Sequence, residues 1–170
     1  MKQRRTTVAS TMLLVCSLAA CEGSDDSSAS HGHSVSHAGT SGEEDDFKGC
    51  PDGYPNVAPG LQVMGEQLAV KVIAASPAEP ERYINGWTVE LSARDGSPAL
   101  DAELIRGQTF MPVHGHDGRV QPKLTALELP GQFEVDRLNF TMRGPWEVRF
   151  WLRAGSGAED HVVFNVCVAK

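Results

Sequence analysis

The chain has 170 residues, with 15 basic and 22 acidic side chains and a formal net charge of −7 at pH 7. No basic patch with interleaved aromatic residues is present to neutralise phosphates, so we expect no nucleic-acid partner. The length allows one globular domain of ordinary size.

Residues 1–20 have the pattern of a secretion signal. Basic residues near the start precede an apolar stretch, residues 12–20, that is too short to span a bilayer and ends in small side chains. Residues 18–20 resemble the bacterial lipobox, which implies cleavage before Cys21 and attachment of a lipid to it. The alternative is an ordinary signal cut nearby, which would leave a free thiol. We therefore exclude residues 1–20 from the fold.

A lipid on Cys21 would hold the protein at a membrane of the bacterial cell envelope, facing the periplasm or the surface. Glu22 follows the lipidation site. Because it is not the aspartate associated with inner-membrane retention in enterobacteria, we favour the outer membrane over the inner one.

Residues 21–46 read as a tether. They are rich in Ser, Gly, His and acidic residues, contain no aromatic residue, and carry seven acids and no base. Such a segment cannot bury enough surface to offset its ordering entropy, so we expect disorder and a span of roughly 25–30 Å. His31, His33 and His37 offer two readings, a loose metal-binding tract or solvated residues.

The globular part is expected over residues 47–170, with 12 bases and 15 acids. Outside the cytoplasm, Cys50 and Cys167 most simply pair with each other, which would join the N-terminal segment to the last strand. Two alternatives are thiolate ligation of a soft metal, and a redox role that would show as an easily reduced bond.

Apolar residues alternate with polar ones along this region, a pattern typical of half-buried strands bounded by Gly and Pro turns. The alternating segments are residues 68–74, 87–93, 100–104, 133–142, 146–152 and 162–168. The apolar parity changes at Asp136 and Arg137, which predicts a β-bulge. About seven short strands and no helical periodicity predict an all-β fold, an immunoglobulin-like antiparallel β-sandwich.

The segment around residues 110–118 carries the chemistry. His114 and His116, spaced i, i+2 on an extended backbone, would project to one side and could converge on one ion. Met111 adds a thioether, and a set of thioether and imidazole donors favours copper, particularly Cu(I). Asp117 could orient an imidazole or serve only as a turn residue. The alternative is a structural loop, with Met111 in the core and the histidines satisfied by backbone carbonyls or solvent.

The sequence of residues 111–116, followed by residues 131–135, 138–142 and 144–148, resembles the YtkA-like domain family, related in pattern to FixH-type domains. The resemblance covers about residues 87–168. It implies an envelope-associated immunoglobulin-like sandwich with a link to copper handling. Carried onto the matching positions, it implies Met111, His114 and His116 as ligands, and Met142 as a fourth.

Two functions from different classes follow. The first is a lipid-anchored protein that binds or transfers copper. The second is a metal-free interaction module for another envelope protein. We expect no enzymatic activity, because no nucleophile elbow, zinc-protease helix or phosphate-binding loop is present. His161 lies on the polar face of the last predicted strand, where a solvated surface residue is expected.

Overall fold

The computed structural model describes residues 47–170. The predicted signal, the lipidation site Cys21 and the tether with its three histidines lie outside the described residues. Within residues 47–170 there is no helix, and hence none that could cross a membrane.

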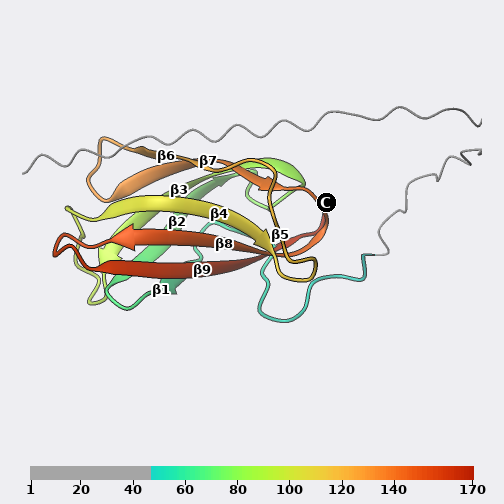
Figure 1. The fold of residues 1–170 in the computed structure, drawn as a ribbon, viewed down its shortest axis with the longest axis horizontal. Coiled ribbons are helices and arrows are strands. Elements are labelled where there is room, and N and C mark those ends of the chain that lie inside the picture. Colours follow the sequence, from blue (N-terminus) through green and yellow to red (C-terminus); the bar gives the residue numbers. More distant parts are fainter. Residues whose placement is uncertain (1–46) are drawn as a thin grey trace, which may run out of the picture. The chain divides into compact units, whose positions relative to one another are not determined.

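Within the described residues, nine strands form two antiparallel sheets. The two sheets pack face to face, as Figure 1 shows. The first sheet has the order β1-β2-β3-β7-β6 and the second has the order β5-β4-β8-β9. The strands are β1 (Gln62–Met64), β2 (Leu68–Ser76), β3 (Tyr83–Ala93), β4 (Glu103–Met111), β5 (His116–Asp117), β6 (Lys123–Ala126), β7 (Gln132–Phe140), β8 (Gly144–Arg153) and β9 (Glu159–Val168). In the central strands this order is the ABED and CFG arrangement of immunoglobulin-like sandwiches.

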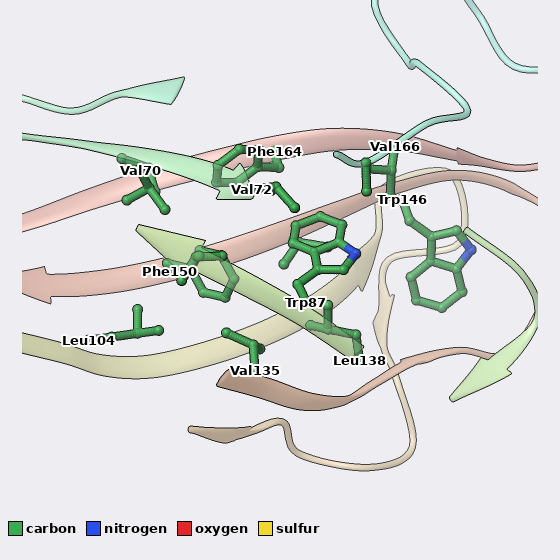
Figure 2. Packing of buried hydrophobic residues seen from close by; sticks show 14 of the residues in the cluster. Val70, Val72, Trp87, Leu104, Val135, Leu138, Trp146, Phe150, Phe164 and Val166 are labelled. Carbon is green, nitrogen blue, oxygen red and sulfur yellow. The ribbon is translucent and has the colours of Figure 1, made fainter. Parts of the chain in front are cut away.

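The core lies between the two sheets and is built around aromatic residues. Trp87 on β3 meets the rings of Phe150 and Phe164 edge to face, with centroids 6.4 and 5.7 Å away. Figure 2 shows these rings among the branched aliphatic side chains of both sheets. Because edge-to-face pairs of this kind add to the free energy gained by burial, they hold the sheets at a fixed separation.

The predicted fold is confirmed, and three differences have a local cause. β4 extends to Met111, beyond the predicted end at residue 104, because its inward positions include Gly107 and Thr109, which give no apolar alternation. β1, β5 and β6 have four residues or fewer, so they are too short for an alternation of apolar and polar residues to be recognised in the sequence. The structure therefore has nine strands where about seven were expected.

The predicted bulge is confirmed. Asn85 and Trp87 on β3 pair with Leu138 and Val135 on β7, so β7 carries one residue more than its partner between these pairs. Arg137 sits in the left-handed region with φ 61°. This extra residue restores the inward direction of the second half of β7.

The predicted disulfide is also confirmed. Cys50 is bonded to Cys167 near the end of β9, across a sequence separation of 117 residues. The amide of Cys167 also donates to the carbonyl of Pro55, at 2.7 Å. The N-terminal segment is thereby fastened along the edge of the second sheet, and a loop of that length can add on the order of 4–5 kcal/mol in the chain-entropy treatment.

A buried carboxylate fastens the other end of β9. The Asp160 side chain accepts backbone N–H bonds from Glu66, Gln67 and Leu68 in the turn between β1 and β2, and one from His161. Burial acts to raise the pKa of this carboxyl, but the four N–H donors outweigh it and hold the pKa below its usual value. A Cβ at Gly65 would overlap the carboxylate, so only glycine allows this approach.

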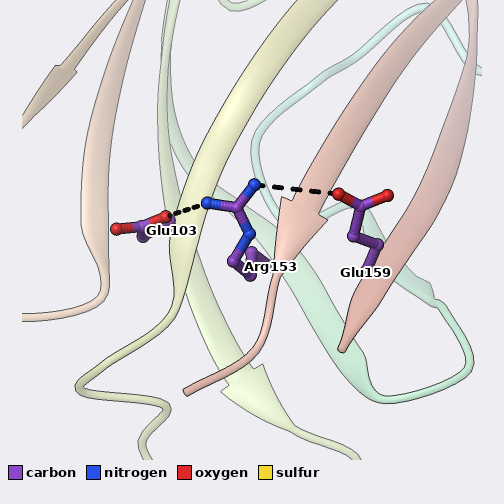
Figure 3. Close-up of polar contacts among 3 residues, drawn as sticks. All are labelled: Glu103, Arg153 and Glu159. Atoms are coloured by element: carbon purple, nitrogen blue, oxygen red, sulfur yellow. Dashed lines mark hydrogen bonds and ion pairs between the residues drawn. The ribbon is translucent and has the colours of Figure 1, made fainter. Parts of the chain in front are cut away.

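Exposed ion pairs lie at the same end of the sandwich. Figure 3 shows Arg153 on β8 between Glu103 on β4 and Glu159 on β9, at 3.1 and 3.7 Å. All three side chains are solvent-exposed, so their contribution to stability is small.

Replacing Asp160 with Asn should lower the free energy of unfolding at pH 7 by about 2–3 kcal/mol, because one amide oxygen cannot accept the bonds that the carboxylate accepts. The carboxylate stabilises the fold above its unfolded-state pKa of about 3.9, and this contribution disappears as the pH falls through the lower pKa of the native state. Urea denaturation at pH 7 and pH 3 measures both effects.

The matched control is Asp95→Asn, since the Asp95 side chain is exposed and bonds only to Ser97 two residues away. We expect a much smaller loss there. Equal losses in the two variants, or a loss at Asp160 that does not change with pH, would contradict this account.

Candidate functional site

Three of the four candidate ligands belong to the hairpin that joins β4 to β5. Met111 ends β4 and pairs in register with His116, the first residue of β5. His114 lies in the four-residue turn between them. Extended backbone was predicted at His114, and that prediction is wrong. Gly115 closes the turn at φ 65°, and its amide donates to the carbonyl of Met111 at 2.8 Å. Glycine takes this left-handed conformation without steric strain.

The hairpin is held against the end of β7 by a close backbone approach. The Thr109 hydroxyl donates to the carbonyl of Asn139 at 3.0 Å, and the Asn139 side chain accepts the amide of Arg119 at the same distance. Both Thr109 and Asn139 are buried. Gly118 lies between them, where a Cβ would overlap the Thr109 hydroxyl and the Asn139 carbonyl oxygen. The position of β5 therefore depends on glycine at 118.

The turn between β7 and β8 brings a second methionine to the same end of the sandwich. Met142 is half-buried in this turn, and its carbonyl accepts the indole N–H of Trp146 at 3.0 Å. The Met111 side chain reaches the turn as well, since a Cβ at Gly144 would lie 2.8 Å from the Met111 methyl group. The Met111 side chain thus reaches from the end of β4 to the turn that contains Met142.

Met111, His114 and Met142 line one open pocket of about 270 Å³. Met111 is 2% exposed and belongs to the core, whereas the His114 side chain is exposed. Residues 47–49 form another wall of the pocket. They are placed there by the adjacent disulfide, because Cys167 pairs with Pro145, which also lines the pocket. Figure 1 shows the ends of β4 and β9 and the N-terminal segment meeting at this end of the sandwich.

His116 lies beside this pocket and does not line it. Its ring meets Trp146 edge to face at 5.7 Å, and its Nδ1–H donates to the backbone carbonyl of Asp117 at 3.0 Å. Asp117 therefore orients the imidazole through its main chain, which leaves Nε2 as the free donor atom. A backbone carbonyl fixing the tautomer in this way is common among metal-binding histidines.

The two imidazoles are close and nearly parallel, with centroids 5.9 Å apart and planes at 23°. Rings that share an ion through nitrogens about 2 Å from it have centroids no more than roughly 6.3 Å apart. The observed separation of the centroids lies inside this limit. An ion shared by both rings would have a wide angle between its two bonds to nitrogen. Of the two histidines, His114 is the one that lines the pocket together with the two methionines.

This donor set is soft. Within residues 47–170, no three side chains drawn from His, Cys, Asp and Glu are grouped so that they could hold a metal ion. What the pocket offers is two thioethers and one imidazole, with a second imidazole beside it. Thioether sulfur favours Cu(I), whereas calcium and magnesium need oxygen donors. The donors that line the pocket are thus of the chemical type that a monovalent copper ion prefers.

Sequence reasoning missed two residues at the site. The indole N–H of Trp146 fixes the turn that carries Met142. Because buried indoles usually find a hydrogen-bond acceptor, this contact was open to inference. Arg143 lines the pocket, and no sequence signal pointed to it. His161 is exposed on β9 as expected, with its ring 4.9 Å from Trp151 at the Asp160 end of the strand.

Gly118→Ala should move the hairpin away from β7 and lower the free energy of unfolding by about 1–3 kcal/mol, as overpacking of a filled site does. Gly115→Ala is the matched control, because a Cβ there meets no atom and only the positive φ is strained. NMR should show shifted Trp146 indole and His116 ring signals in the first variant. Unshifted signals in Gly118→Ala would contradict the close approach described above.

Comparison with known proteins identifies the family. Among solved structures, the chain is similar to the crystal structure of a DUF4426 family protein from Pseudomonas aeruginosa PAO1. The sequence identity is 13% and the TM-score 0.46, over 64% of this chain and 96% of that chain. No curated protein matches the chain significantly. Residues 66–150, half of the chain, match the YtkA-like family. Membership of this family supports an envelope-associated β-domain, and the chain belongs to the YtkA-like family.

Proposed function

We propose that this protein binds copper as Cu(I) in the cell envelope and passes it to a partner. The observation that carries the proposal is that Met111, His114 and Met142, from the β4–β5 hairpin and the β7–β8 turn, line a single pocket. His116 is the fourth donor, held beside the pocket with its Nε2 free. The match to the YtkA-like family does not identify a bound metal, so the proposal depends on this donor set alone.

The arrangement suits transfer as well as storage. Met111 is buried and fixed by the core, while His114 is exposed on a turn. An ion held between a buried sulfur and an exposed imidazole can exchange the exposed ligand for one from an incoming protein. A lipid on Cys21 and the tether would keep the domain near a membrane, with reach enough to meet an envelope partner.

The test is a competitive titration with a chromophoric Cu(I) chelator, using ascorbate so that no thiol competes for copper. The protein starts at residue 21 with Cys21→Ser, and the tether histidines are replaced by serine, so that only the domain supplies soft ligands. We expect one Cu(I) per chain. Met111→Leu/His114→Ala/Met142→Leu should weaken binding by at least about 100-fold, since losing several ligands exceeds the effect of one supporting residue.

The matched control removes one thioether and one imidazole elsewhere. Met64→Leu/His161→Ala changes two exposed residues away from the pocket and should leave the affinity unchanged. Leucine keeps the volume of methionine, so the Met111 substitution should not disturb the core. Equal affinities in the unsubstituted protein and the triple variant would end the copper proposal.

The second candidate is a metal-free interaction module, favoured by the outer face of the second sheet. There Arg106 stacks over Trp151 at 4.3 Å and Arg149 over Phe110 at 3.8 Å. Arginine and tryptophan are enriched among residues that dominate binding energy at protein interfaces. The test is to capture an envelope partner in the presence of a chelator. A partner that still binds the triple variant but no longer binds Trp151→Ala would support this function over copper binding.

A further inference from the structure

The charge around the pocket is opposite in sign to that of the domain. Residues 47–170 contain more acids than bases. Among residues 47–170, those that line the pocket nevertheless include two bases, Lys48 and Arg143, and no acid. A pocket for a divalent cation would be expected to gather carboxylates. Arg143 instead places a positive charge at the rim of this pocket.

Arg143 has the more definite place of the two bases. It follows Met142 directly in the turn between β7 and β8, and its side chain is exposed. Other arginines of the domain are neutralised by acids, such as Arg149 by Glu147 and Arg153 by Glu103. Among residues 47–170, no carboxylate forms an ion pair with Arg143. Its positive charge therefore acts on whatever occupies the pocket.

We propose that Arg143 determines the specificity of the pocket, by disfavouring divalent ions more strongly than monovalent ones. This inference rests on the proposed function. The repulsion between a fixed guanidinium and a bound ion is proportional to the charge of the ion. Cu(I) and Zn(II) are both d¹⁰ ions without a geometric preference from d electrons, so charge is the main electrostatic difference between them.

The expected relation between the changes in Cu(I) and Zn(II) affinity does not depend on the distance between Arg143 and the ion. If removing the Arg143 charge strengthens Cu(I) binding by some factor, the same geometry and screening should strengthen Zn(II) binding by the square of that factor. For an exposed charge within about 8 Å, the Cu(I) factor is roughly three- to tenfold, and the Zn(II) factor roughly ten- to a hundredfold. Both factors should shrink at high salt, because the guanidinium is exposed to the solvent.

The experiment measures the dissociation constants of Cu(I) and Zn(II) for the protein with the tether histidines and Cys21 replaced by serine. The variants are Arg143→Gln, Arg143→Glu and the control Lys71→Gln, an exposed base on β2 in the other sheet. We expect the logarithm of the Zn(II) change to be twice that of the Cu(I) change. Arg143→Glu should double both logarithms, and Lys71→Gln should change neither constant.

The outcomes separate this inference from the copper proposal. If Cu(I) binds the unsubstituted protein and not the triple ligand variant, the copper site stands. If Arg143→Gln then leaves the ratio of the Cu(I) and Zn(II) dissociation constants unchanged, Arg143 does not select the ion. Equal factors for both ions would also overturn the inference, since they would indicate a steric effect. If the unsubstituted protein binds no Cu(I), both proposals fall.

Discussion

The close approach between the β4–β5 hairpin and the end of β7 determines whether this domain has a site at all. The candidate donors come from two turns that are distant in sequence, and the Thr109–Asn139 hydrogen bond that joins their strands spans 30 residues. Gly118 permits the approach, and Trp146 fixes the second turn through the Met142 carbonyl. Without these contacts, the methionines and histidines would belong to unrelated loops.

The pocket is also coupled to the stability of the sandwich. Met111 serves as core residue and candidate ligand together, so the sulfur is held by the same packing that joins the two sheets. The wall at residues 47–49 depends on the Cys50–Cys167 disulfide. His114 and Arg143 are exposed at the rim of the pocket. The proposed transfer depends on this combination of a buried sulfur and an exposed imidazole.

The sequence allowed the sandwich to be predicted where alternation was strong. β2, β3, β8 and β9 were recognised because apolar residues alternate along them, and the bulge at Arg137 because the parity changes there. The second half of β4 was missed because Gly107 and Thr109 face inward. The disulfide followed from cysteine count and compartment. These features depend on local pattern, which a single sequence contains.

The site was predictable only in part. The spacing of Met111, His114 and His116 directed attention to the hairpin that borders the pocket, but strand geometry was assumed for His114, which lies in the turn. The place of Arg143 at the pocket depends on how two distant turns meet, which no spacing reveals.

The most direct measurement is X-ray absorption at the copper edge of the Cu(I)-loaded protein without tether histidines. The account predicts sulfur neighbours at about 2.3 Å together with imidazole nitrogen at about 2.0 Å. Sulfur neighbours that disappear in Met111→Leu/Met142→Leu would confirm the pocket as the site. A spectrum with nitrogen and oxygen neighbours alone would contradict it.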